Sequence, residues 1–344
     1  MDHLIVDALR DLLIGQCTPA AVRAIEAEVA AQPGQASASA AALWQQIEET
    51  GFADLLLPES VGGAGLVLRD AFSVWDLLGQ HAMPLPLGET MLARAWLATA
   101  GAKVPAGAIA LAPHLLAVDG GAQAAGVRGA RVADWVLAQE GAQLVLLPLA
   151  AAQASPSIFV LDADLRWGAD ALAQAQRVAA PASLLVAQAG LVSALLAGAL
   201  LTTFEKTLNF ANERQQFGRP IGKFQAIQHE LAVMAEHVSA SRMAAQIACE
   251  ANGLQADALK VAVGKARTSE AAVEVASLAH SIHGAIGFTT EFDLQLFTRR
   301  LHLWRQTANS EAYWQLQAGQ ALVAAGGISL DVIRQITDST APAA

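Results

Sequence analysis

Apolar residues recur at three- and four-residue steps through most of the first hundred residues, and this spacing predicts amphipathic helices. Leu9 and Leu13 belong to the first such pattern. Thr18–Pro19 opens the second pattern, where proline at the first helical position costs nothing because its missing N–H would have no helical acceptor. Gly51 ends a third pattern, and further apolar patterns follow it. We therefore predict an all-α domain over residues 1–104.

The pattern changes after this region, where short apolar runs are separated by Gly, Asp, Pro or Ser. Runs of three to six residues with turn-forming residues between them are typical of strands. We predict a small β domain over residues 105–181. The expected strands cover residues 109–111, 135–137, 144–149 and 158–161.

Four long helical patterns follow, with short breaks between them. Gly218 and Pro220, for example, interrupt the chain between the first and second patterns, because neither residue suits a helix interior. Long helices with short connections are typical of a helical bundle. We predict a four-helix bundle over residues 182–330 and a tail over residues 331–344 that is loose after Asp338. The fold class expected is mainly α with a small β domain.

Residues 183–204 carry no charge and are long enough to cross a bilayer. No basic cluster lies at either end of the segment, although such clusters orient spanning helices. Gly190, Ala194 and Gly198 recur at four-residue spacing, which lets another helix approach closely. We therefore expect the buried central helix of a bundle, with a membrane span as the alternative.

Composition and charge narrow the classes of function. The net charge of −10 and the lack of a basic run argue against a nucleic-acid partner. Cys17 and Cys249 give neither a metal-binding spacing nor a disulfide framework, which indicates a reducing compartment. The acidic first residues lack the order of a signal peptide. We expect a cytoplasmic protein with no metal site.

Two short segments at breaks between the long helical patterns are candidates for ligand binding. The first is Glu-Arg-Gln-Gln-Phe-Gly at 213–218, where Arg214 and Gln216 could donate to phosphate or ring oxygens and Phe217 could lie against a planar ring. The alternative is an interhelix loop with a solvated arginine. The second is His-Gly-Ala-Ile-Gly-Phe-Thr at 283–289, whose small residues permit close backbone approach to a phosphate or sugar.

These two segments, in this order, resemble the flavin-contacting segments of the acyl-CoA dehydrogenase family. A loop at 57–65, Leu-Pro-Glu-Ser-Val-Gly-Gly-Ala-Gly, is similar to the family loop Pro-Glu-x-x-Gly-Gly-x-Gly, which lies near the acyl chain. The resemblance implies an N-terminal helical domain, a middle β domain and a C-terminal four-helix bundle. It also implies FAD as cofactor and α,β-dehydrogenation of an acyl-CoA thioester as the reaction.

The resemblance further implies which residues contact FAD. Residues of the first segment would reach the flavin pyrophosphate or pack on the adenosine part, and Gln225 and the second segment would close over the nucleotide across a subunit interface. Ser281 and Ala285 depart from the family pattern, which has Gln and Gly at these places. The implied contacts are Arg214, Gln216, Phe217, Ile221, Gln225, Gly284, Ala285 and Gly287.

The catalytic carboxylate of the family has no clear counterpart. The two usual positions of the base are occupied by Ala308 and Gln188, neither of which accepts a proton at neutral pH. Glu311 is the nearest carboxylate, and it is either a displaced base or a solvated helix residue. His283 and His302 are weaker alternatives. The middle domain is also shorter than in typical members and lacks their Thr-Glu-Pro and Trp-Ile-Thr motifs.

Three hypotheses about function follow from this pattern. In the first, the chain is a subunit of a heteromeric acyl-CoA dehydrogenase and contributes a half-site for the flavin, while a second dehydrogenase-type subunit supplies the catalytic Glu. Acyl groups of fatty acids or steroid side chains, an electron-transfer flavoprotein as acceptor and a dimer of dimers belong to this expectation. In the second, the chain is a self-sufficient homotetramer that uses Glu311 as base. In the third, it is a non-catalytic acyl-CoA or assembly module.

Overall fold

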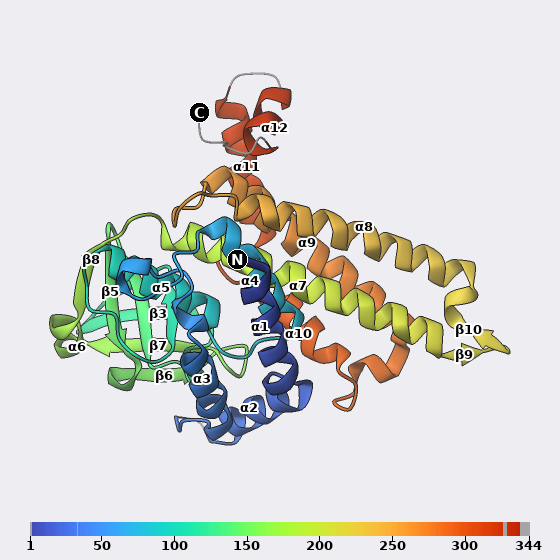
Figure 1. The fold of residues 1–344 in the computed structure, drawn as a ribbon, viewed down its shortest axis with the longest axis horizontal. Helices are drawn as coiled ribbons and strands as arrows, with labels where there is room; N and C mark the ends of the chain where they lie inside the picture. Colours follow the sequence, from blue (N-terminus) through green and yellow to red (C-terminus); the bar gives the residue numbers. More distant parts are fainter. Residues whose placement is uncertain (1, 33, 326–328, 338–344) are drawn as a thin grey trace. The chain divides into compact units, whose positions relative to one another are not determined.

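The computed structural model describes residues 2–32, 34–325 and 329–337, and the chain forms two compact units (Figure 1). The first unit consists of Met1–Ala71, Met83–Leu191 and Asn252–Gln255. The second consists of Phe72–Ala82, Val192–Ala251 and Ala256–Ala344. These units do not follow the boundaries of the three predicted domains, so the three-domain division stays a prediction.

The helices of the first unit begin and end where the sequence signals lie. Thr18 Oγ1 accepts from the N–H of Ala21, and Ser37 caps the next helix in the same way, satisfying donors that a helix N-terminus leaves open. Gly51 ends α3 with a φ of 74°, a left-handed conformation that favours glycine. The helical elements are α1 (Asp2–Gln16), α2 (Pro19–Ala31), α3 (Ala38–Thr50), η1 (Phe52–Asp54), η2 (Glu59–Val61), α5 (Leu87–Thr99), η3 (Ala130–Val132), η4 (Leu149–Ala151) and α6 (Ala169–Gln174).

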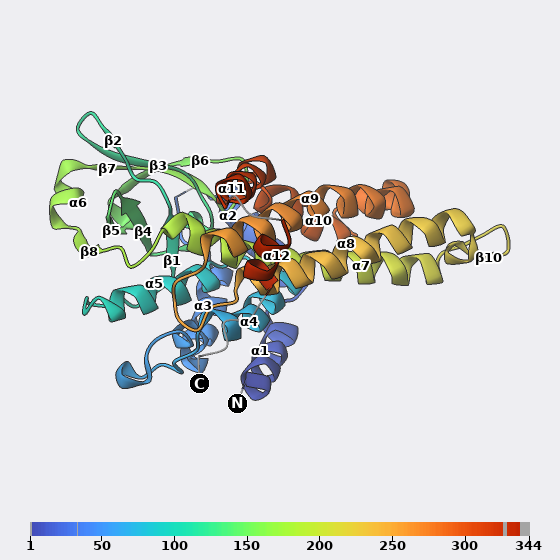
Figure 2. The same cartoon turned by 90° about the horizontal axis from the view of Figure 1, so that it is seen from above.

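Two four-stranded sheets form the β part of this unit, with strand orders β1-β4-β5-β8 and β2-β3-β7-β6. Figure 2 shows them as two layers, and their inner faces share a core of small apolar residues around the buried Trp167. Only the β1–β4 pairing is parallel among the strand pairs of the described residues. The strands are β1 (Ile109–Ala112), β2 (Leu116–Val118), β3 (Gly121–Val127), β4 (Trp135–Glu140), β5 (Gln143–Pro148), β6 (Ala152–Pro156), β7 (Ala163–Gly168) and β8 (Gln176–Ala179).

Three predicted strands are confirmed by β1, β4 and β5, but the strand predicted at residues 158–161 is wrong. This segment is the turn between β6 and β7, and the side chain of Ile158 is exposed. Asp162 explains the difference, because its N–H donates to Phe159 O and its carboxylate accepts from Gly129 N at 2.9 Å. An apolar run that ends in such an Asp suits a turn as well as a strand.

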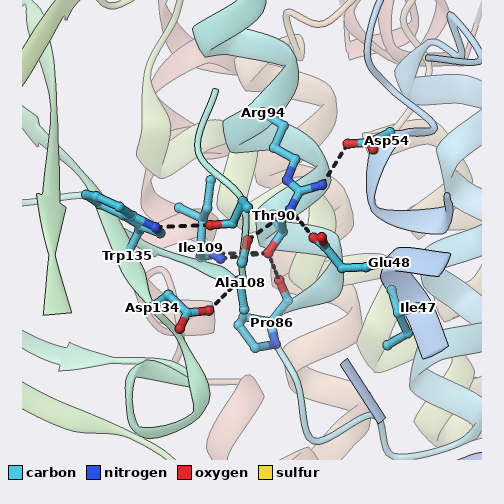
Figure 3. A network of polar contacts seen from close by, with 12 residues as sticks. Ile47, Glu48, Asp54, Pro86, Thr90, Arg94, Ala108, Ile109, Asp134 and Trp135 are labelled. Carbon is cyan, nitrogen blue, oxygen red and sulfur yellow. Dashed lines mark hydrogen bonds and ion pairs between the residues drawn. The ribbon is translucent and has the colours of Figure 1, made fainter. Parts of the chain in front are cut away.

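A polar network joins the helices of the first unit to strand β1 (Figure 3). Arg94 on α5 is buried and donates to Asp54 at 2.8 Å, to Gly107 O at 3.0 Å and to Glu48. Thr90, one helical turn earlier, accepts from the N–H of the β1 residue Ile109 at 2.8 Å. A buried guanidinium is stable only when its donors find partners, so this network fixes the α3, η1 and α5 region.

The second unit contains the helical bundle. The fourth predicted helical pattern, residues 292–325, is wrong as a single helix, because it divides into α10 and α11 around residues 305–310. A short helix, α12, overlaps the start of the predicted tail, and the part that was expected to be loose, from Asp338 on, is outside the described residues. The helices are α4 (Leu68–Gln80) and α7 (Leu184–Glu213), each of which begins in the first unit, then α8 (Gln225–Ala248), α9 (Ala258–His283), α10 (Leu294–Trp304), α11 (Glu311–Ala324) and α12 (Ser329–Thr337).

Helix α7 is long and apolar enough to cross a membrane by composition, but 83% of its most apolar window is buried inside the protein. Within the second unit, glycines allow α4 and α7 to pack backbone to backbone. A Cβ on Gly198 would lie 1.8 Å from Asp76 O, and one on Gly79 would lie 2.1 Å from Leu195 O. The close approach predicted from Gly198 is therefore present, and α7 has the burial expected of a central bundle helix.

Replacing Gly198 by Ala should lower the free energy of unfolding by about 1–3 kcal/mol, because the new methyl group would force α4 and α7 apart. Gly319→Ala on α11 is the control, since a Cβ there meets nothing within 4 Å and should stabilise the helix by about 0.4–1 kcal/mol. Urea unfolding of both variants checks this. Equal effects of the two substitutions would contradict the close packing.

Candidate functional site: the cavity at the bundle end

The first candidate segment forms a β-hairpin between α7 and α8 (Figure 1). Its strands are β9 (Gln215–Gln216) and β10 (Arg219–Pro220), joined by Phe217 and Gly218 with φ of 51° and 80°. Two central residues with positive φ are the geometry of the tight hairpin turn whose twist suits antiparallel strands. The N–H of Ile221 donates to Arg214 O at 2.8 Å and closes the hairpin at its base. The side chain of Phe217 is 92% exposed at the tip.

The second candidate segment ends α9. Gly284 has φ 64° and ψ −147°, a backbone conformation that is essentially confined to glycine. The short helix η6 (Gly284–Phe288) follows, and a Cβ on Gly287 would lie 3.0 Å from the Cβ of His283. The chain therefore reverses sharply at this corner, and the positions of its two glycines are set by backbone geometry and by packing.

Both segments line one cavity of about 560 Å³ within the second unit, which we call the corner cavity. The two segments therefore meet within one chain, and the expectation that they also close over a nucleotide across a subunit interface stays a prediction. Six of the eight predicted cofactor contacts line the cavity, whereas Gln225 and Gly287 do not. The six are Arg214, Gln216, Phe217, Ile221, Gly284 and Ala285.

The cavity also has an aromatic wall that sequence reasoning missed. Phe210 on α7 lines it and stacks on the His283 ring, with centroids 4.3 Å apart. Phe224 lines it as well, and the guanidinium of Arg219 lies over that ring at 4.2 Å. Phe210 lies one helical turn before Arg214, and this spacing is the only signal in the sequence that could have indicated it.

His283 is a packing residue in this structure. Its Nδ1 donates to Ala279 O at 2.7 Å, and its ring contacts both Phe210 and Phe292, which also contact each other. Burial lowers the pKa of His283, and the nearby His280 lowers it further. A neutral imidazole with one nitrogen committed to the backbone fixes the end of α9.

The neighbouring His280 also contacts residues at this corner. Its Nε2 lies 3.0 Å from Thr298 Oγ1, and its ring stacks on Phe288 at 4.1 Å. Burial lowers the pKa of His280, and His302 contributes in the same direction. Burial lowers the pKa of His302 as well, with a smaller effect of Arg305.

The positions at which the resemblance places the catalytic base hold no ionisable side chain. Gln188 is buried in the first unit, with Nε2 3.4 Å from Leu111 O. Ala308 lies in the turn between α10 and α11, in the second unit. Glu311 begins α11 and pairs with Arg305, so its carboxylate is engaged by a guanidinium. None of these residues lines the corner cavity.

The comparisons with known proteins agree with this architecture. The profile of the acyl-CoA dehydrogenase C-terminal domain matches residues 179–307. The acyl-CoA dehydrogenase IpdE2 of Mycolicibacterium smegmatis is 30% identical over 305 residues, which cover 87% of this chain and 92% of that protein. The chain belongs to the acyl-CoA dehydrogenase family.

Two solved structures share the fold. The ChsE4-ChsE5 complex from Mycobacterium tuberculosis superimposes with a TM-score of 0.77 at 18% identity, covering 94% of this chain and 97% of that one. A variant of the steroid ACAD Tcur3481-Tcur3483 gives a TM-score of 0.78 at 22% identity, covering 95% and 99%. The predicted fold class, helical at both ends with a small β region in the middle, is confirmed.

FAD is the cofactor of this family, as the resemblance implied. The residues of the corner cavity fit the adenosine diphosphate half of such a molecule. Arg214 and Gln216 offer donors for phosphate oxygens, and Phe217 offers a ring face for adenine. The backbone at Gly284 is open, with nothing within 4 Å of a Cβ position. Among the residues that the structure describes, no group of acidic, cysteine or histidine side chains could hold a metal ion.

Arg214→Gln should weaken FAD binding by roughly 10- to 100-fold, because a hydrogen bond to a charged group contributes about 1.5–3 kcal/mol. Arg299→Gln is the control, since Arg299 is exposed on α10 and does not line the cavity. Titration of the flavin-free chain with FAD, followed by visible absorbance and fluorescence, measures both affinities. Wild-type affinity in Arg214→Gln would remove Arg214 from the site.

Proposed function

We propose that the chain is a subunit of a heteromeric FAD-dependent acyl-CoA dehydrogenase, in which a partner subunit supplies the catalytic Glu. One observation carries this proposal. The cavity that suits the adenosine half of FAD is intact, whereas Ala308 and Gln188 occupy both places where the family carries its base. An alanine and a primary amide cannot remove the α proton of a thioester at neutral pH.

The named relatives support a two-subunit enzyme. ChsE4-ChsE5 is described as a complex, and Tcur3481-Tcur3483 as a steroid ACAD with two components in its name. This chain has the length and fold of those chains. We infer an acyl-CoA substrate with a bulky acyl group, such as a steroid side chain, or a fatty acyl group. The reaction class is α,β-dehydrogenation.

The side chains indicate which part of FAD this chain would bind and which step the partner would perform. Arg214 and Gln216 bind the pyrophosphate, and Phe217 packs against the adenosine part. Ile221 closes the cavity floor, and the bare backbone of Gly284 admits a sugar or phosphate at short range. When bound, FAD accepts the hydride that leaves the β carbon. The α proton goes to a carboxylate outside this chain.

The other two predicted contacts, Gln225 and Gly287, do not line the cavity and act through neighbouring residues. Gln225 follows Phe224, a residue of the cavity wall, and begins α8. Gly287 is buried in η6 and lets the chain pack against His283. Ala285, on the cavity surface, replaces a second glycine of the family pattern without filling the corner.

The assembly is proposed to be a dimer of dimers. Phe217, Ile286 and Phe288 expose 92%, 46% and 69% of their surface, and large apolar side chains gathered beside a cavity are typical of an interface. An electron-transfer flavoprotein is the proposed acceptor of the electrons. We also propose a cytoplasmic location and no nucleic-acid partner, from the cysteine usage and the net charge of −10.

The self-sufficient alternative depends on Glu311. In this structure the carboxylate pairs with Arg305 at the start of α11, and the residue is half-buried. Proton abstraction would require this ion pair to open first. The module that has lost flavin altogether is the remaining alternative, and a colourless protein would favour it.

The purified lone chain should show no dehydrogenation of acyl-CoA esters, whereas the chain co-expressed with its partner should be active. Glu311→Gln should leave the activity of the complex unchanged, because Glu311 is bound to Arg305 and not to substrate. Steady-state assays with an artificial electron acceptor measure both. Robust turnover by the lone chain, abolished by Glu311→Gln, would establish the self-sufficient enzyme instead.

A further inference from the structure

Lys265 on α9 is fully buried, and its ammonium contacts three acceptors in the second unit. Nζ donates to Ser269 Oγ at 2.8 Å, to Arg305 O at 2.9 Å and to Asn309 O at 3.0 Å. An ammonium has three N–H donors, so these contacts use all of them. Two of the acceptors lie at either end of the segment between α10 and α11, which we call the 305–310 turn.

The 305–310 turn has an unusual backbone. Ala308 has a φ of 54° and Asn309 a φ of 72°, left-handed conformations that a Cβ disfavours. Such conformations persist where the surrounding contacts over-determine them. Lys265 supplies two of these contacts, and Trp314 supplies another by donating its indole N–H to Ala308 O at 2.7 Å. The turn shape is therefore imposed from α9 and α11.

The charges around Lys265 are few. Glu311 at the start of α11 raises the pKa of Lys265, and Arg305 at the end of α10 lowers it. On the α8 side, the neighbouring Gly264 packs against Ala244 and Ala248. Burial is the largest influence and lowers the pKa of Lys265 to about 7.

We propose that Lys265 is a positioning residue whose three Nζ contacts impose the shape of the 305–310 turn and so fix the backbone at residue 308. The relevance of this role of Lys265 to catalysis rests on the proposed function, because position 308 is where the resemblance places the base. The chain would then have lost the carboxylate while keeping the structure that holds it. The turn shape would also be independent of the side chain at 308.

Hydrogen–deuterium exchange of the full-length chain tests this proposal. Lys265→Met keeps the apolar stem and removes the three donors, so the amides of residues 305–307, which donate to carbonyls at the end of α10, should lose at least about tenfold in protection. Lys260→Met is the matched control, since Lys260 is another buried lysine of α9, and it should leave these amides unchanged. Ser269→Ala, which removes one acceptor, should fall between the two.

A pH series on the wild-type chain gives a second readout. Opening the turn hydrates Lys265, and above pH 7 the opened state binds a proton that the closed state lacks. By linkage, the closed turn should become more stable as pH rises above about 7, by up to ~tenfold per pH unit after correction for intrinsic exchange. Lys265→Met should show no such rise. A turn whose opening leaves Lys265 buried would be flat in both proteins.

Equal protection in the wild type and Lys265→Met would overturn the proposal. So would wild-type protection of these amides in Ser269→Ala, which keeps the proposal falsifiable even if Lys265→Met does not fold. The measurement needs neither flavin nor a partner subunit. Its failure would leave the half-site proposal standing, and activity of the lone chain would leave the role of Lys265 standing.

Discussion

The close packing of α8 against α9 is the contact on which the candidate site depends. A Cβ on Gly264 would lie 2.6 Å from Ala244 O, so a glycine is required where the two helices meet. A short connection joins the end of α8 to the start of α9. The start of α8 therefore lies beside the end of α9, and the hairpin at Arg214 meets the corner at Gly284. The corner cavity is a consequence of this antiparallel pairing.

Local chemistry made much of the fold predictable from sequence. Thr18 and Gly51 mark helix ends because hydroxyl caps and left-handed glycines have direct physical roles. The division of the last helical pattern was missed although Asn309 and Ser310 are turn- and cap-forming residue types, because apolar residues at helical spacing continue on both sides of this pair. The strand predicted at 158–161 failed since periodicity does not distinguish a short apolar turn from a strand.

The candidate site was predicted in part for the same reasons. Arg214 and Gly284 stand out by residue type and by their place at helix breaks, and the structure brings them onto one cavity. Phe210 did not stand out, because an aromatic residue inside an apolar helix has the sequence signature of any core position. Gln225 was expected at the cavity and is not there, since the orientation of a side chain at a helix start depends on the preceding turn.

The proposed function depends on which parts of the family's site this chain has and which it lacks. In the proposed function, the chain keeps the cavity for the adenosine half of FAD and the 305–310 turn, and it lacks the catalytic carboxylate. The most direct measurement is the structure of the complex co-purified with its partner, with FAD bound. The account predicts the adenosine diphosphate between Arg214 and Gly284 of this chain, with a Glu of the partner subunit at the thioester. A carboxylate of this chain at the thioester, or FAD distant from the corner cavity, would contradict it.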